Sequence, residues 1–240
     1  MPQDKEILAL VPARSGSRGI KDKNILRIVD KTVLDYTVEA GLSATMTDRV
    51  IVSTDSPLYR DIALSAGAEA PFLRPVELAL DTTPSIDVII HALKWLADKE
   101  SYSPDILVLL QPTTPLRDGR HVDEAINRML DSGADSVVSL VASQRCLYRL
   151  CELDEDGRVR ILKHTDYVRR QEVPMIYREN GAIYASYADR ILDQKKLLGE
   201  RIAGYIMSER DSIDIDTDLD LKLLKILLSE RRQNSGEKWK

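Results

Sequence analysis

Short apolar runs alternate with stretches of helical periodicity through the first half of the chain. A short run of apolar residues that is bounded by turn residues is typical of a buried strand. Such runs predict strands at residues 7–11, 49–53, 105–110 and 136–141. Apolar residues at helical spacing lie between these runs and predict helices at residues 33–45, 57–66, 84–98 and 118–131.

Strands that alternate with helices in this way form βαβ units, in which helices cover both faces of a mainly parallel sheet. The sequence therefore predicts an α/β, Rossmann-like fold. Ligands of such sheets bind beyond the carboxyl ends of the strands. The segments that leave these ends start at Pro12, Ser53, Gln111 and after Val141, and three of the four are polar.

The pattern changes between about residues 142 and 188. Residues 148–162 alternate around DEDG at 154–157, which is a hairpin turn signal, and GAIYASY at 181–187 predicts a further strand. We interpret this stretch as a small antiparallel excursion from the parallel sheet. The chain is thereby divided into a main α/β domain of residues 1–141 and 189–232, an insertion of residues 142–188, and a polar tail of residues 233–240.

The end of the main domain contains one more strand and a closing helix. Residues 203–207 form the strand, and residues 218–232 have the spacing of an amphipathic helix. The side chains that we expect to face the core from this helix are Leu219, Leu223, Ile226 and Leu227.

Composition limits the classes of partner. The 240 residues are 43% hydrophobic and 30% charged, as in a soluble globular protein, and the net charge of −5 argues against a nucleic-acid binder. No apolar run approaches the roughly 18 residues that span a bilayer, and MPQDKE does not resemble a signal peptide. We expect a cytoplasmic protein without a membrane partner. Cys146 and Cys151 lack zinc-site spacing, and reduced thiols are favoured over a disulfide.

The loop after the first strand, PARSGSRGIKDKN at 12–24, carries a surplus of positive charge. It matches neither GxGxxG nor GxxxxGK[ST]. Glycines nevertheless let backbone N–H groups approach an anion, and Arg and Lys side chains neutralise it. At the carboxyl end of a strand this loop predicts a phosphate cradle with Arg14 and Lys23. The alternative is a solvated charged turn.

A carboxylate pair, Asp214 and Asp216, lies near the end of the chain in SIDIDTDLDL. Residues two apart in an extended segment point the same way. Two carboxylates on one side suit Mg²⁺ that is held jointly with substrate phosphates. The alternative is an acidic cap for the following helix. A cationic loop and a carboxylate pair together predict a metal–triphosphate site.

Arginines in the antiparallel stretch form a third group. Arg169 and Arg170 are adjacent, and Arg178 and Asn180 precede GAIY. A pair of arginines can hold a carboxylate through bidentate hydrogen bonds. Exposed surface arginines are the alternative.

Six motifs occur in one order: PARSGSRGIKDKN, STD, LRPVELALDTTPS, LLQPTTPLR, RENGAIY and SIDIDT. This set resembles the acylneuraminate cytidylyltransferases, also called CMP-sialic acid synthetases, over residues 7–228. The resemblance implies an Mg²⁺-dependent reaction of CTP with a sialic acid that gives the CMP-sugar and pyrophosphate. It also implies a homodimer, in which the insertion serves dimerisation and reaches over the partner's active site.

The resemblance also implies residue roles. Arg14, Lys23 and Asn24 would contact the triphosphate, and Arg14 and Lys23 would stabilise the transition state. Arg74 and Ser85 would hold the cytidine. The implied sugar-binding residues are Gln111, Arg170, Arg178 and Asn180. Asp214 and Asp216 would hold the metal, Asp214 with a catalytic role.

One stretch departs from the family. Members of the family often carry a stretch with His and Pro that ends in Lys after the fourth strand, and here SQRCLYRL places Arg149 at the position of that Lys. Because Arg and Lys are not interchangeable at a shaped site, the departure concerns how the sugar is recognised.

The sequence leaves several questions open. The rival enzyme class is an Mg²⁺-dependent glycosyltransferase that uses Asp214-Ile215-Asp216 as a DxD motif, and a nucleotide sensor without catalysis is a second rival. The sugar could be N-acetylneuraminate, its deaminated analogue, legionaminate or pseudaminate. The general base and the number of Mg²⁺ ions are not identified.

Overall fold

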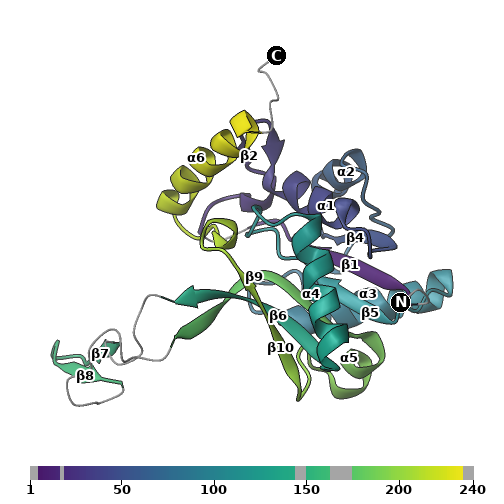
Figure 1. The fold of residues 1–240 in the computed structure, drawn as a ribbon. Helices are drawn as coiled ribbons and strands as arrows, with labels where there is room; N and C mark the ends of the chain where they lie inside the picture. Colours follow the sequence, from purple (N-terminus) through teal and green to yellow (C-terminus); the bar gives the residue numbers. More distant parts are fainter. Residues whose placement is uncertain (1–4, 17–18, 144–149, 163–174, 235–240) are drawn as a thin grey trace.

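A six-stranded sheet forms the centre of the molecule in the computed structural model (Figure 1), which describes residues 5–16, 19–143, 150–162 and 175–234. The strand order is β10-β6-β9-β5-β1-β4. The bounds are β1 Ile7–Pro12, β4 Arg49–Ser53, β5 Ile106–Leu109, β6 Ser136–Ser143, β9 Ile176–Tyr187 and β10 Ile202–Met207.

Five strands of this sheet run in one direction. β1 pairs in parallel with β4 and β5, and β10 pairs in parallel with β6. β9 is antiparallel to both of its neighbours, β5 and β6. The prediction of a mainly parallel sheet with an antiparallel component is therefore confirmed.

Helices cover both faces of the sheet, as the apolar runs predict. The side chains of β1 alternate: Ile7, Ala9 and Val11 enter one core cluster with α1, α2 and α4, whereas Leu8 and Leu10 enter another with α3 and α5. The bounds are α1 Val33–Ser43, α2 Pro57–Ser65, α3 Ser85–Glu100, α4 Gly119–Ser132, α5 Ala188–Gln194 and α6 Asp218–Asn234.

Side-chain caps explain where two of these helices begin. Thr32 precedes α1 and Asp118 precedes α4, and each forms a capping box with the third residue of its helix. Pro84, expected as the first residue of its helix, is the residue before α3 instead. The remaining short elements are β2 Arg27–Ile28, β3 Lys31–Thr32 and the 3₁₀ turns η1 Lys23–Ile25, η2 Val76–Leu78 and η5 Arg210–Ser212.

The predicted hairpin around residues 154–157 is confirmed. β7 Cys151–Leu153 and β8 Val159–Ile161 pair antiparallel, and they lie well apart from the sheet at the lower left of Figure 1. Cys151 is an exposed free thiol, and Cys146 lies outside the described residues. β9, in contrast, runs through the middle of the sheet. The division of the chain into domains stays a prediction.

The inward face of α6 differs from the one expected. Leu219, Leu223 and Ile226 are exposed at 73%, 39% and 56%, whereas Leu224 and Leu228 are buried. The buried residues pack against Ile28, Val33, Leu116 and Ile215, with Leu221 and Leu227 beside them. Apolar residues surround most of this helix, so its periodicity alone does not select a face, and the packing partners decide it.

Among the helices of the described residues, none has the length and apolar composition needed to cross a membrane.

Gly119 should be essential to the packing of α4 on α1. A Cβ at Gly119 would overlap the backbone of Ser43 and Ala44, whereas a Cβ at Gly133 would enter open space. Gly133 has a φ of 62°, so its replacement costs only the left-handed conformation. We expect Gly119→Ala to lower the free energy of unfolding by about 1–3 kcal/mol through overpacking, more than Gly133→Ala. Urea unfolding measures both, and equal losses would contradict the close approach.

Candidate active site

The loop of residues 12–24 is hydrogen-bonded to the segment that follows β4. The Ser15 backbone N–H and hydroxyl donate to the two carboxylate oxygens of Asp55, at 2.8 and 2.6 Å. Burial would raise the pKa of Asp55, but the hydrogen bonds from Ser15 and the nearby Arg74 charge outweigh it and lower that pKa. A charged Asp55 therefore fixes the first turn of the loop.

Arg14 lies within this loop. Its Nη1 donates to the carbonyls of Ser15 and Gly16, at 3.4 and 3.2 Å, and its Nη2 pairs with Asp81. The buried Asn24 amide donates to the Arg14 carbonyl at 3.1 Å. In this structure Asn24 thus holds the loop backbone, and its predicted contact with the triphosphate is untested.

Arg74 and Ser85 lie at the two ends of the next segment, residues 74–85. Arg74 is only 5% exposed, and its guanidinium donates to the hydroxyl of Ser53 at 3.1 Å and also to the Ser53 carbonyl. Burial lowers the pKa of Arg74 to about 10, which the charge of Asp55 opposes. Arg74 braces its segment against β4. Ser85 is exposed at the first position of α3, and the cytidine role of both residues stays a prediction.

Lys23 joins the loop to the carboxylate segment near the end of the chain. Its Nζ lies 3.3 Å from Asp216 Oδ1, 193 residues away in sequence, and also donates to the Ile215 carbonyl. A Cβ at Gly19 would lie 3.5 Å from the Asp216 carbonyl oxygen. The cationic loop and the carboxylate pair therefore meet, as the sequence predicts.

Asp214 and Asp216 differ in their surroundings. Asp214 Oδ1 is buried and, within the described part of the chain, has no hydrogen-bond partner, whereas Asp216 is exposed. Burial raises the pKa of Asp214, and Asp216 adds to the rise, while Thr113 and Lys23 oppose it. The helix cap is a separate pair, because Thr217 N–H donates to Asp220 Oδ2 at 2.7 Å. The cap interpretation of the carboxylate pair is therefore not supported.

The donors present fit a hard divalent cation. Magnesium uses one or two protein carboxylates and completes its shell with water and substrate phosphates. The unpartnered Asp214 oxygen and the exposed Asp216 carboxylate are donors of that kind. No group of three or more His, Cys, Asp or Glu side chains suited to a metal occurs among the described residues. Substrate oxygens would have to supply the remaining ligands.

A glycine lies where the predicted sugar and metal residues come close together. Gly181, on β9, has a φ of 73°. A Cβ there would lie 3.0 Å from Gln111 Oε1, 3.5 Å from Thr114 Oγ1 and 3.9 Å from Asp214 Oδ2. The predicted sugar contact Gln111 and the predicted metal ligand Asp214 thus converge on one position, which a larger side chain would fill.

Asn180, the residue before Gly181, is buried inside the protein. Its side chain is buried, accepts from the Ser139 hydroxyl at 2.6 Å and donates to the Ser212 hydroxyl at 2.8 Å. Its amide is thus engaged within the protein and positions Ser212, two residues before Asp214. The sugar contact that the resemblance implies for Asn180 stays a prediction.

The other predicted sugar residues lie on or near the antiparallel stretch. Arg178 is exposed on β9, and its Nη1 donates to the Glu179 carbonyl at 3.5 Å. Arg149 and Arg170 lie outside the described residues, as does Arg169, so the predicted arginine clamp stays a prediction.

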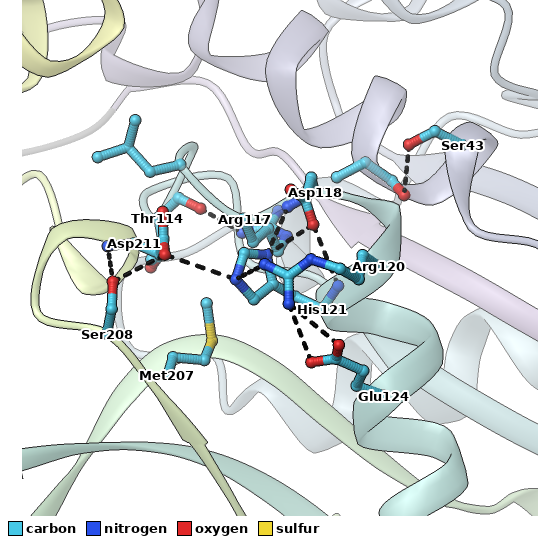
Figure 2. Close-up of polar contacts among 12 residues, drawn as sticks. Ser43, Thr114, Arg117, Asp118, Arg120, His121, Glu124, Met207, Ser208 and Asp211 are labelled. Carbon is cyan, nitrogen blue, oxygen red and sulfur yellow. Dashed lines mark hydrogen bonds and ion pairs between the residues drawn. The ribbon is translucent and has the colours of Figure 1, made fainter. Parts of the chain in front are cut away.

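Sequence reasoning missed Arg117, although the LLQPTTPLR motif contains it. Arg117 is fully buried, and its Nη1 donates to the carbonyls of Gln111 and Thr114, at 2.7 and 2.6 Å. Burial lowers the pKa of Arg117 to about 9. Figure 2 shows the side chain beside Thr114 and Asp118. Arg117 holds the turn that carries Gln111 and Thr113.

A second missed group connects α4 with the carboxylate segment (Figure 2). His121 Nδ1 lies 2.7 Å from Asp118 Oδ1, and its Nε2 lies 3.6 Å from Asp211 Oδ2. The hydrogen bond with His121 is the main reason that the pKa of Asp118 is lowered. Asp118 also accepts from Arg231 of α6 at 2.9 Å. No sequence motif links these residues, because the fold alone brings them together.

Comparisons with known proteins identify relatives of this chain. The chain is 39% identical over 222 residues to an N-acylneuraminate cytidylyltransferase of Escherichia coli O18:K1:H7, covering 91% of the chain and 51% of that relative. It therefore spans about half the length of that relative. A CMP-N,N'-diacetyllegionaminic acid synthase of Legionella pneumophila is 31% identical, with 92% of the chain and 96% of the relative covered.

Solved structures agree on the fold. A CMP:2-keto-3-deoxy-manno-octonic acid synthetase in complex with CTP superposes with a TM-score of 0.71 at 19% identity, covering 94% of this chain and 99% of the other. The family model described as Cytidylyltransferase matches residues 8–233. The matched range includes the loop of residues 12–24, the turn at Gln111 and the Asp214–Asp216 segment. The chain belongs to the cytidylyltransferase family.

Proposed function

We propose that this chain is an Mg²⁺-dependent cytidylyltransferase that joins CTP to a sialic acid or a related nine-carbon 2-keto acid sugar. The products would be the CMP-sugar and pyrophosphate. The observation that carries this proposal is the contact of Lys23 with the Asp214–Asp216 segment. It brings a cation proposed to bind phosphate next to the carboxylates proposed to hold the metal.

The named relatives support the class of substrate. Their names refer to N-acylneuraminate and N,N'-diacetyllegionaminic acid, and a further relative, 26% identical over 229 residues, is a pseudaminic acid cytidylyltransferase of Campylobacter jejuni. All three names denote acidic sugars. The choice among them depends on a few polar contacts to substituents.

The reaction that we propose is an in-line displacement at the α-phosphorus of CTP. A bond forms between that phosphorus and the anomeric oxygen of the sugar, the bond to the bridging oxygen of the β-phosphate breaks, and the hydroxyl proton is lost. Negative charge grows on the leaving pyrophosphate. Arg14 and Lys23 would stabilise this charge, and removing one such donor typically costs about 10²–10³ in rate.

Asp214 and Asp216 would hold Mg²⁺, which when bound neutralises phosphate charge and orients the α-phosphate. The backbone between the two carboxylates is anchored, because Ile215 N–H donates to the Thr113 carbonyl at 2.9 Å. Lys23 would turn from Asp216 to a phosphate oxygen when nucleotide and metal are both bound. Metal bound at Asp216 would free Lys23 for a phosphate, and phosphate bound at Lys23 would free Asp216 for the metal.

The sugar would lie next to Gly181. Gln111 would contact its polar substituents, and its carboxylate would be held by arginines, for which Arg149, Arg170 and Arg178 remain the candidates. We also propose a homodimer, in which the partner's insertion contributes to this side of the site. We also propose a cytoplasmic location, where CTP would be available as the substrate.

A glycosyltransferase is not favoured. Its DxD motif would need Asp214 and Asp216 but not the cationic loop, whose Lys23 contacts Asp216. The match to the cytidylyltransferase family model also argues against it.

The function is tested by product analysis on a panel of sugars. We expect the purified protein to release pyrophosphate from CTP and Mg²⁺ only when a nine-carbon 2-keto acid sugar is added, and to form the CMP-sugar in equal amount. N-acetylneuraminate, legionaminate and pseudaminate should differ in kcat/KM. Activity restricted to an eight-carbon acid, or transfer of a sugar from a nucleotide donor, would exclude the proposal.

The raised pKa of Asp214 gives a second expectation. An ionised carboxylate whose pKa is higher in the folded than in the unfolded state destabilises the fold at neutral pH, and this effect disappears in acid. Asp214→Asn should therefore raise Tm by about 1–4 °C in the absence of Mg²⁺, and it should abolish turnover when Mg²⁺ is present. The measurement is a thermal melt at pH 7.5 and again near pH 4.

Asp220→Asn is the matched control. Burial would raise the pKa of Asp220, but hydrogen bonds from Thr217 outweigh it, so this carboxylate stabilises the fold above its pKa. Its replacement should lower Tm at pH 7.5. A lower Tm for Asp214→Asn as well would show that the carboxylate pair is structural.

A further inference from the structure

Asp81 is an acidic residue at the phosphate side of the site to which no role has been assigned. It lies between η2 and α3, and its carboxylate pairs with Nη2 of Arg14. The two side chains are partly buried, with 24% of Asp81 and 30% of Arg14 exposed. The arginine expected to bind phosphate thus already carries a carboxylate on one edge.

The position of Arg14 does not depend on this carboxylate alone. Its other terminal nitrogen, Nη1, donates to the Gly16 carbonyl at 3.2 Å. Its backbone carbonyl accepts from Asn24 at 3.1 Å, and the next residue, Ser15, is bound to Asp55 through two hydrogen bonds. If the Asp81 charge were removed, Arg14 would keep its backbone anchors and its guanidinium would have one competitor fewer.

We propose that Asp81 is an internal counter-ion that occupies the phosphate-binding edge of Arg14 and is displaced by the triphosphate. The proposal rests on the proposed function for the identity of the anion. Asp81 weakens the binding of each phosphate ligand, since each must break the same ion pair. When pyrophosphate has formed, Asp81 competes for Arg14 again and promotes release of this product.

Asp81 differs from Asp216, the acidic partner of Lys23, in its relation to the proposed metal site. Asp216 belongs to the carboxylate pair that would hold the metal, so its replacement would remove a metal ligand together with the ion pair. Asp81 lies in the segment between Arg74 and Ser85 and is not one of the proposed metal ligands. Its replacement therefore leaves the carboxylate pair unchanged.

The physical size of the effect follows from the geometry of the pair. An exposed ion pair contributes up to about 1 kcal/mol, and partial burial reduces the screening by water. Loss of the competing carboxylate should tighten anion binding by roughly two- to tenfold. The gain should shrink as salt is added, because salt screens the same charges.

The experiment compares Asp81→Asn with the wild type by isothermal titration with inorganic pyrophosphate and with CTP. Glu77→Gln is the matched control, since it removes one negative charge from the same segment at an exposed side chain. We expect Asp81→Asn to bind both ligands two- to tenfold more tightly and to be inhibited by pyrophosphate at correspondingly lower concentrations. Glu77→Gln should change neither affinity by more than about 1.5-fold.

Weaker binding of pyrophosphate by Asp81→Asn would overturn the proposal, because Asp81 would then orient Arg14 rather than compete for it. An equal gain for Glu77→Gln would also overturn it, since the effect would be one of net charge. Thermal melts establish that the variants are folded. The pyrophosphate titration needs no turnover, so a protein that binds as expected but forms no CMP-sugar would refute the proposed function and leave the role of Asp81 standing.

Discussion

The contact of Lys23 with the Asp214–Asp216 segment is the constraint on which the site depends. It joins a loop after the first strand to a segment before the last helix, 193 residues apart. The loop contributes the cations Arg14 and Lys23, and the later segment contributes the carboxylates Asp214 and Asp216. Placed together, they match the charges of a metal–triphosphate complex, in which a phosphate needs the cations and a metal needs the carboxylates.

Buried polar groups keep the two halves in this relation. Arg117 holds the carbonyls of the turn at Gln111, and Asn180 holds Ser212 just before the carboxylates. A buried polar side chain is costly unless its partners are in place, so these networks favour one arrangement of the segments over looser ones. A Cβ at Gly181 would come within 3.0 Å of Gln111 Oε1, so a larger residue would disturb this arrangement.

The sequence predicted the sheet, its helices and the two charged stretches, because periodicity and local composition determine these features. It did not predict which face of α6 is buried, since apolar residues surround that helix and only packing against Ile28 and Leu116 decides the matter. It did not predict the internal hydrogen bonds of Asn180, and it overlooked Arg117 and His121. Their partners come from distant segments, so no spacing in the chain reveals that these side chains are used internally.

The central claim, that Lys23 and Asp216 act in one site, is tested most directly by a double-mutant cycle on kcat/KM. The variants are Lys23→Met, Asp216→Asn and the combination. If the two residues serve the same phosphate–metal complex, the loss in the double variant should be smaller than the sum of the single losses by at least about 1 kcal/mol. Losses that add within about 0.5 kcal/mol would contradict a shared site.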